Sequence, residues 1–241
     1  MKENFLGTRS DLYLEKNYKN FSLNCDIKVF KEVENNISYN TIYFSNLNNV
    51  NLIKEKLNKE LSFFINKVVV KKNFHVLVIG LGNENHTADS VGPKTLKYLK
   101  INSYLTNLGI DINNNKISSL EPGVLGQTGI ATRRIVESVT KEIKPDLVIL
   151  IDSYVSEKVD YLNKTIQISD GGISPGGGLN GINFEISKKT LNIPTITIGI
   201  PTAIEIEIDK HFYILSTKDI DDYVNKISEI IGESLNEVLF N

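Results

Sequence analysis

Hydrophobic positions divide the chain into segments that look alternately like strands and like helices. Apolar, β-branched runs predict buried strands over residues 75–82, 146–152, 164–170 and 194–200. Helices are predicted over residues 89–100, 131–143 and 217–239, the last from its amphipathic pattern. Strands that alternate with helices indicate an α/β fold with helices on both faces of the sheet.

The first 70 residues are polar and rich in asparagine. They still contain an alternating segment that predicts a strand over residues 38–44 and an apolar stripe that predicts a helix over residues 52–64. No internal repeat and no low-complexity linker interrupts the chain. We therefore expect a single domain over residues 1–241, built on a mostly parallel sheet flanked by helices.

Composition narrows the functional classes. Hydrophobic residues make up 41% of the chain and charged residues 23%, which is typical of a soluble globular protein, and the net charge is −2. This balance argues against direct nucleic-acid binding and against an anionic-membrane binder. The only cysteine, Cys25, excludes an internal disulfide. No apolar run approaches a membrane span and the N-terminus lacks the core of a signal peptide, so we expect a cytoplasmic protein.

Two aspartates stand where α/β sheets collect their working groups, beyond the carboxyl ends of strands. Asp152 ends the predicted strand over residues 146–152, and Asp89 follows the glycine-rich turn after the strand over residues 75–82. Each has a structural interpretation, Asp89 as a helix cap and Asp152 as a partner of a loop backbone. If the two strands are neighbours, however, the carboxyl groups form a pair that shares one proton, with one member acting as base and the other as acid.

Other chemistries find less support in the sequence. The glycines near Asp89 lack the dinucleotide-binding spacing, and there is no P-loop, HExxH or GxSxG motif, so we expect no cofactor and no dedicated metal site. His86, three residues before Asp89, is the candidate to bind a metal or to orient a carboxylate. A glycine-rich loop after the third strand is either flexible or a place where an extended peptide binds; its candidate substrate-binding residues are Gly171, Gly172, Gly176, Gly177 and Gly178.

Several segments together resemble the germination protease family of endospore-forming bacteria. The matching stretches are TRSDLYLE (8–15), VIGLGNENHTADSVGP (78–93), EPGVLGQTGIAT (121–132), LIDSYV (150–155), KTIQISDGGISPGGGLN (164–180), TIGIPTAI (197–204) and STKDIDDYVNKI (216–227). Their order spans nearly the whole chain, and the combination is far more specific than any single stretch.

The resemblance implies both a fold and an activity. It places the catalytic aspartates at Asp89 and Asp152 and implies a fold similar to the hydrogenase-maturation endopeptidases. The implied activity is endopeptidase cleavage of small acid-soluble spore proteins, which coat DNA in the dormant spore. Family members are made as inactive precursors in the forespore, lose a short N-terminal piece by self-cleavage, here residues 1–7, and assemble as homotetramers.

The chain also departs from the family pattern. Family members are usually longer, and here only residues 205–215 separate TIGIPTAI from STKDIDD. Two alternatives therefore stay open. One is a metal-dependent processing peptidase of the hydrogenase-maturation type, which would need a ligand such as His86. The other is a non-enzymatic spore protein that binds a peptide in the glycine-rich loop.

Overall fold

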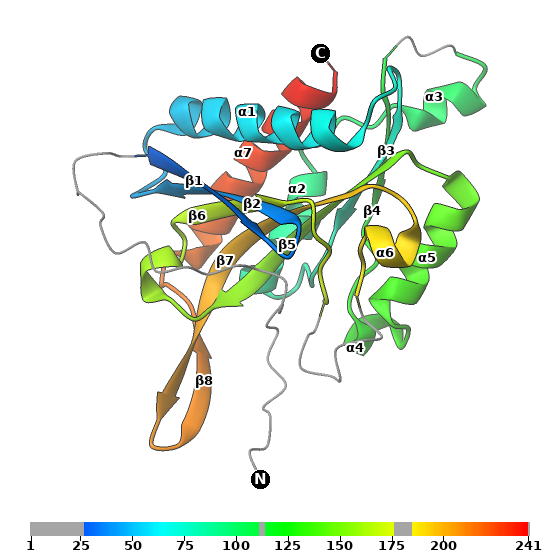
Figure 1. Ribbon diagram of the computed structural model, residues 1–241. Helices are drawn as coiled ribbons and strands as arrows, with labels where there is room; N and C mark the ends of the chain where they lie inside the picture. The colour runs from blue at the N-terminus through cyan, green and yellow to red at the C-terminus, as the bar shows by residue number, and fades with distance from the viewer. Residues whose placement is uncertain (1–26, 111–113, 176–184, 241) are drawn as a thin grey trace.

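A computed structural model describes residues 27–110, 114–175 and 185–240, which form an eight-stranded sheet with helices on both faces (Figure 1). The strands follow the order β1-β2-β6-β7-β5-β3-β4, and β8 pairs with β7 off this path. Their bounds are β1 Ile27–Glu34, β2 Ile37–Phe44, β3 His75–Gly80, β4 Lys116–Leu120, β5 Leu147–Ser156, β6 Thr165–Ser169, β7 Thr195–Ile208 and β8 His211–Leu215.

The helical segments lie between and after these strands. Their bounds are α1 Val50–Val68, η1 Thr87–Asp89, α2 Val91–Leu96, α3 Ser103–Asn107, α4 Leu125–Thr128, α5 Thr132–Ile143, η2 Val159–Tyr161, α6 Lys188–Leu191 and α7 Ile220–Leu239. In the ranges that the structure describes, no helix combines the length and the apolar character that a membrane crossing requires.

The sheet is mixed, so the prediction of a mostly parallel sheet was wrong. β5 runs parallel to both β3 and β7, and β3 runs parallel to β4. β6 is antiparallel to β7 and β2, and the β1–β2 and β7–β8 pairs are antiparallel hairpins. The physical reason is connection length. Only residues 157–164 join β5 to β6, too few for the crossover that a parallel return would need, so the chain reverses direction.

The alternation of side chains along β3 builds two separate hydrophobic layers. Val76 and Val78 belong to the core beneath α1 and α7, whereas Leu77 and Ile79 belong to the second core, which includes Val136 of α5. Successive side chains of a strand point to opposite faces, so one continuous apolar run supplies both layers. The predicted helices over residues 52–64, 131–143 and 217–239 are confirmed as α1, α5 and α7, which cover these faces.

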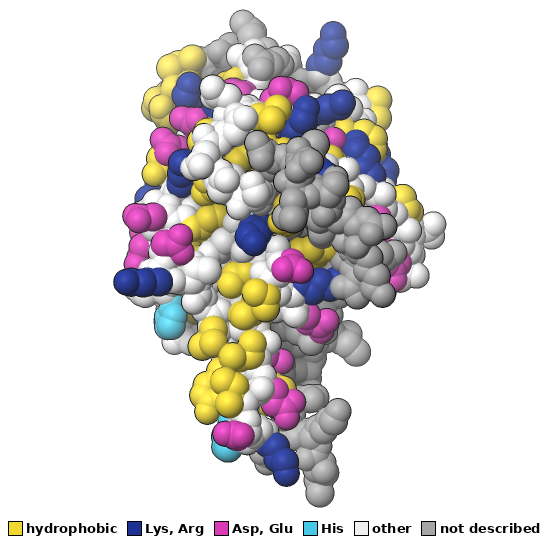
Figure 2. Space-filling model, turned by 90° about the vertical axis from the view of Figure 1, so that its left-hand side faces the viewer, with side chains coloured by type: hydrophobic (Ala, Val, Ile, Leu, Met, Phe, Trp, Pro, Cys, Tyr) yellow, Lys and Arg dark blue, Asp and Glu magenta, His cyan; other side chains and the backbone are white. Residues whose placement is uncertain are grey.

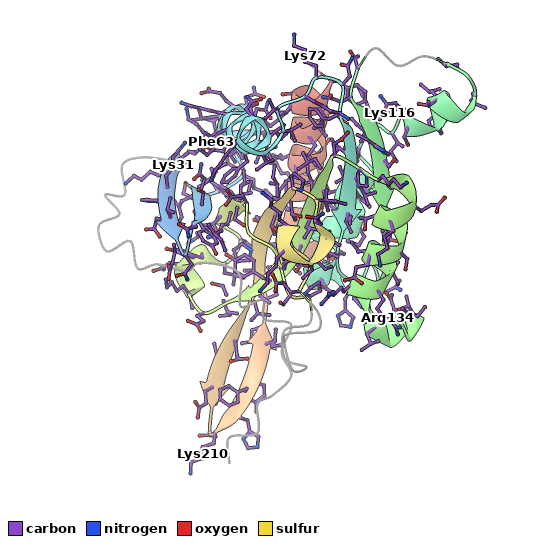
Figure 3. The ribbon with its side chains drawn as sticks, turned by 45° about the vertical axis from the view of Figure 1, so that its right-hand side comes forward. Lys31, Phe63, Lys72, Lys116, Arg134 and Lys210 are labelled. Atoms are coloured by element: carbon purple, nitrogen blue, oxygen red, sulfur yellow. The ribbon has the colours of Figure 1, made fainter. Side chains whose placement is uncertain are left out.

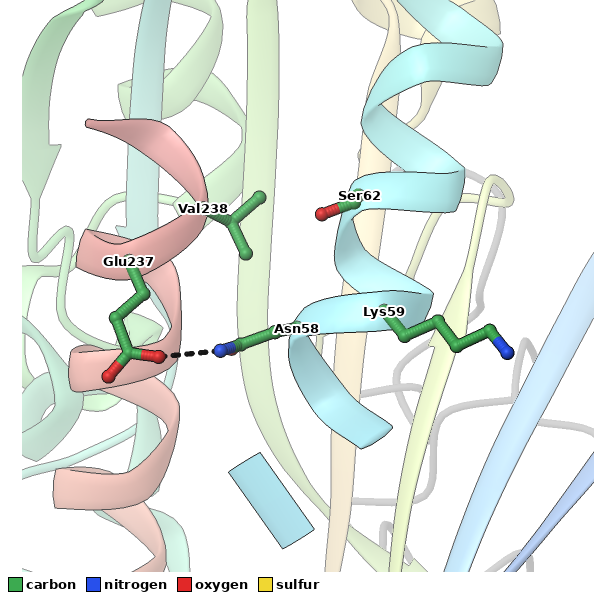
Figure 4. A pocket seen from close by; sticks show the side chains of 5 residues that line it. All are labelled: Asn58, Lys59, Ser62, Glu237 and Val238. Carbon is green, nitrogen blue, oxygen red and sulfur yellow. Dashed lines mark hydrogen bonds between the residues drawn. The ribbon is translucent and has the colours of Figure 1, made fainter. Parts of the chain in front are cut away.

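Polar contacts hold α1 on two of its sides. At one side, Lys31 of β1 forms an ion pair with the buried carboxylate of Glu60 at 2.7 Å and lies 5.0 Å from the ring centroid of Phe63 (Figure 3). At the other, the Asn58 amide donates to Glu237 of α7 at 2.6 Å beside a hollow of about 520 Å³ (Figure 4). The hollow is lined by Asn58, Lys59, Ser62, Glu237 and Val238, and neither of the two candidate aspartates is among them.

Several predicted boundaries differ from the observed ones. The predicted helix over residues 89–100 is a turn of 3-10 helix, η1, followed by the short helix α2, which ends at Leu96. The predicted strand over residues 146–152 continues to Ser156, and the one over residues 194–200 continues to Ile208. Residues 153–156 of β5 extend by pairing with residues 200–204 of β7, and β7 continues to Ile208 because residues 204–208 pair with β8.

Glycines allow the beginning of α2 to touch the end of β3 and the middle of β5. A Cβ atom at Gly92 would lie 2.3 Å from the Leu81 carbonyl oxygen and 2.7 Å from that of Ile151. A Cβ atom at Gly80 would lie 2.5 Å from the Gly92 carbonyl carbon. Each of these contacts involves backbone, which cannot rotate aside, so any larger residue at 80 or 92 would push α2 away from the sheet.

We predict that Gly92→Ala destabilises the fold by about 3 kcal/mol or more, because the added methyl group overlaps two carbonyl oxygens. Urea unfolding followed by circular dichroism measures the change. The control is Gly126→Ala in α4, where a Cβ atom meets no atom within 4 Å and the free energy of unfolding should change by less than about 1 kcal/mol. Equal stability of the two variants would contradict the close packing.

Candidate functional site

Asp89 is held by a compact turn between β3 and α2. The Asn83 N–H donates to the Asp89 carbonyl at 3.0 Å, and the Asp89 N–H donates to the His86 carbonyl at 2.8 Å. Gly82 adopts a φ of +111°, and a Cβ atom there would lie 2.0 Å from the Asp89 carbonyl oxygen and 3.0 Å from its Oδ1. Only glycine therefore fits at residue 82, which fixes where the Asp89 carboxyl group lies.

Asp152 lies within β5, so the prediction that it ends its strand was wrong. It pairs with Gly199 of β7 and is buried, with 7% of its surface exposed. The preceding residue, Ile151, pairs with Gly80 and accepts a hydrogen bond from the Leu81 N–H at 2.8 Å. The strands that lead to the two aspartates are thus neighbours, and the turn bearing Asp89 starts beside Asp152.

Burial raises the pKa of both carboxyl groups but to different extents. Desolvation raises the pKa of Asp89 to about 6, and a backbone hydrogen bond from Asn83 and the charge of His86 oppose this rise. Desolvation also raises the pKa of Asp152 well above its ordinary value, and the negative charge of Asp89 raises it further. The pair therefore titrates in two steps, in which Asp89 ionises first and Asp152 keeps its proton to higher pH.

A cavity of about 430 Å³ opens beside Asp89. It is walled by η1, by the end of β5 and by the base of the β7–β8 hairpin; the lining residues are His86, Ala88, Asp89, Ser153, Tyr154, Val155, Thr202, Ala203, Ile214, Leu215 and Ser216. Asp152 is not among them, although the adjacent Ser153 is. The Ser153 hydroxyl is buried and has no hydrogen-bond partner among the described residues. The cavity and this hydroxyl together make a candidate place for a polar group of a ligand.

Two hydroxyl groups join the hairpin to the turn that bears Asp89. The Ser216 hydroxyl donates to the Thr202 carbonyl at 2.5 Å, and the Thr202 hydroxyl donates to the Ala88 carbonyl at 2.5 Å. These bonds fix the hairpin base against the residue that precedes Asp89. Sequence reasoning overlooked both residues as part of the site, although they stand in the quoted stretches TIGIPTAI and STKDIDDYVNKI.

The glycines predicted to bind substrate are not brought to the cavity where the structure describes them. Gly171 and Gly172 follow β6 and do not line it. A Cβ atom at Gly172 would lie 2.2 Å from Ser187 Cβ, and one at Gly171 would lie 2.9 Å from Ile37 Cγ2, so both glycines allow close packing. The other three, Gly176, Gly177 and Gly178, lie outside the described residues.

His86 is exposed and lines the cavity beside Asp89, as its place in the sequence suggested. Within the described ranges, no group of three or more His, Cys, Asp or Glu side chains is arranged to hold a metal ion. The carboxyl pair with His86 therefore does not form a ready set of metal ligands in this arrangement.

The sequence is similar to germination proteases over most of its length. The family profile described as germination protease matches residues 36–215, from β2 to the end of β8. The germination protease of Geobacillus sp. (strain WCH70) is 41% identical over 150 residues, covering 61% of this chain and 40% of that protein. Those of Clostridium acetobutylicum and Oceanobacillus iheyensis are 34% identical over 203 residues and 40% identical over 173 residues.

The Clostridium match covers 75% of this chain and 62% of its relative, and the Oceanobacillus match covers 70% and 45%. The chain thus spans between 40% and 62% of the length of these three relatives. The profile match extends over most of the sheet and includes both aspartates and every residue that lines the cavity except Ser216. On this evidence the chain belongs to the germination protease family.

Proposed function

We propose that this chain is an endopeptidase that starts the degradation of small acid-soluble, DNA-protecting spore proteins during germination. The observation that carries the proposal is the pair of desolvated aspartates with unequal pKa values beside a cavity. Strongly perturbed carboxyl groups in a cleft are typical of catalytic acids and bases. Family membership supports peptide-bond hydrolysis as the chemistry, and the resemblance implies the substrate.

In the proposed mechanism, the two aspartates divide the proton transfers. Asp89, which ionises first, accepts a proton from a water molecule, and the oxygen of that water attacks the carbonyl carbon of the scissile peptide bond. Asp152, which keeps its proton, donates it to the nitrogen of the leaving amine as the carbon–nitrogen bond breaks. Transfer of the proton from Asp89 to Asp152 then restores the starting state.

The two alternatives are less well supported. A metal-dependent peptidase of the hydrogenase-maturation type would use His86 beside the aspartates, but the described residues do not supply the three-ligand set that such a site needs. A non-enzymatic peptide-binding protein would have no use for two adjacent carboxyl groups whose burial destabilises the fold. We therefore favour a peptidase that uses the two aspartates without a metal ion.

The resemblance extends the proposal to the biology of the protein. We propose synthesis as an inactive precursor, removal of residues 1–7 by self-cleavage, assembly as a homotetramer and a location in the forespore and spore core. Residues 1–7 lie outside the described residues. The similarity in fold to the hydrogenase-maturation endopeptidases is part of the same proposal.

Asp89→Asn and Asp152→Asn should each lower kcat on a small acid-soluble spore protein by about 10³-fold, because each removes one proton-transfer group. The double variant should be no worse than the single variants, as expected of groups that act as a unit. Fragments resolved by mass spectrometry give the rates. Asp222→Asn, the same change at an exposed position of α7, is the control and should keep full activity. Full activity of either site variant would refute the proposal.

The pH profile of kcat/KM should be bell-shaped. Activity should rise with pH through about 6, where Asp89 ionises and becomes a base, and fall at higher pH, where Asp152 loses the proton that it donates. Initial rates in buffers of constant ionic strength measure the two limbs. An acidic limb near pH 4, the ordinary value for an aspartate, would contradict the assignment of Asp89 as base.

Asp152→Asn should stabilise the fold at neutral pH while it abolishes activity. The raised pKa means that the folded protein binds the Asp152 proton more tightly than the unfolded chain does. Wild-type stability therefore falls by about 1.4 kcal/mol per pH unit above the unfolded pKa of 3.8, until the folded pKa is reached. Asparagine does not titrate, so the variant should have a larger free energy of unfolding than wild type at pH 7, and this difference should be lost near pH 3. Urea unfolding at both pH values tests this, and equal destabilisation at both would contradict it.

A further inference from the structure

The β7–β8 hairpin extends away from the body of the molecule and carries Lys210 at its tip (Figures 1 and 3). Asp209 and Lys210 have φ angles of 51° and 65°, which form the tight two-residue turn that suits the twist of paired strands. The turn sets the register, in which Ile208 pairs with His211 and Ile204 pairs with Leu215.

Strand β8 is apolar on both of its faces and is exposed along its length. Phe212, Tyr213, Ile214 and Leu215 are 44%, 46%, 48% and 44% exposed. Figure 2 shows hydrophobic side chains gathered along the projecting lower part of the molecule, where the hairpin lies. Exposed edge strands usually carry charges that prevent pairing with other chains, whereas no charged residue lies between Phe212 and Leu215.

The register shows which backbone groups of β8 point away from β7. In a two-residue hairpin, the closing pair, here Ile208 and His211, exchanges both hydrogen bonds. The pairs alternate from there, so the N–H and C=O groups of Phe212 and Ile214 point to the outer edge. No strand in the described part of the chain pairs with that edge.

The outer edge leads to the candidate catalytic site. Ile214, Leu215 and Ser216, at the end of β8 and just beyond it, line the cavity that contains Asp89. In the same cavity the buried Ser153 hydroxyl has no hydrogen-bond partner in the described part of the chain, and an amide group of a peptide would supply one. A strand edge that continues into a cavity with an unsatisfied polar group suits one extended polypeptide that occupies both.

We propose that the substrate docks as an extra β-strand on the outer edge of β8, hydrogen-bonded to the backbone of Phe212 and Ile214. The docked segment is an extended, unfolded polypeptide whose apolar or β-branched side chains pack beside those of β8. It runs along the hairpin toward Ser216 and delivers the scissile bond beside Asp89. This inference rests on the proposed function and goes beyond it by assigning substrate selection to residues 212–216 instead of the glycine-rich loop.

The test compares proline at two positions that face each other across the hairpin. Phe212 and Glu207 form one of the pairs without mutual hydrogen bonds, so proline at either position removes an N–H that points away from the partner strand. Phe212→Pro blocks the outer edge of β8, whereas Glu207→Pro alters the opposite edge. With a small acid-soluble spore protein as substrate, Phe212→Pro should raise KM about tenfold with kcat within about twofold of wild type. Glu207→Pro should leave both constants within about twofold.

Phe212→Ala distinguishes the effect of the side chain from that of the backbone N–H. It should raise KM by less than about threefold, because alanine keeps the N–H. Sedimentation velocity of every variant shows whether the substitution changes the oligomeric state. Wild-type KM in Phe212→Pro, equal impairment in Glu207→Pro, or loss of a wild-type oligomer in Phe212→Pro would each overturn the docking proposal. The last result would mean that the edge binds a second copy of the chain.

A second measurement needs no variant of the enzyme. Two synthetic peptides that cover the bond cleaved in the spore protein, one N-methylated at odd and the other at even positions, compete with the protein substrate. A docked strand uses alternate amides, so the two inhibition constants should differ about tenfold. Equal constants would overturn the docking mode and leave the catalytic proposal intact, whereas a wild-type chain that cleaves no spore protein would overturn both.

Discussion

The site depends on the contact between the beginning of α2, the end of β3 and the middle of β5. Gly92 packs against the carbonyl oxygens of Leu81 and Ile151, at distances that leave no room for a Cβ atom. Gly82 makes a similar contact with the backbone of Asp89. Because these contacts involve backbone on both sides, they set the position of the Asp89 turn relative to Asp152 with little freedom. The carboxyl pair is thus a consequence of glycine packing as much as of the aspartates themselves.

This packing places two acidic groups where water is scarce, which opposes folding and suits the catalytic role proposed for them. Both carboxyl groups have raised pKa values with desolvation as the main cause, and the charge of Asp89 separates the two titrations. The cores above and below the sheet, built by side chains such as Val78 and Ile79, offset this cost. Destabilising polar groups at the centre of an otherwise consistent fold are expected where function has selected them.

The sequence predicts helices and strands that are buried on one face or on both. It does not predict strands that form only because distant segments pair. The stripe that includes Leu57 and Leu61 identifies α1, and the unbroken apolar runs identify β3 and the first part of β5. The continuation of β5 beyond Asp152 is buried but partly polar, and only its pairing with β7 makes it a strand. Every residue of strand β8 is exposed, so the strand has no alternation of buried and exposed positions that its sequence could reveal. Local sequence patterns identify both aspartates. They do not reveal that β6 is antiparallel to its neighbours, or that Thr202 and Ile214 line the cavity.

The central claim is that Asp89 and Asp152 form one coupled, desolvated pair in which Asp89 ionises first. Its most direct test is a titration of the wild-type protein with ¹³C-labelled aspartate side chains, followed by NMR, with Asp89→Asn and Asp152→Asn used for assignment. We expect one carboxyl signal that titrates near pH 6, a second that titrates at higher pH, and a lower pKa for Asp152 in Asp89→Asn than in wild type. Two independent titrations near pH 4, unaffected by either substitution, would contradict it.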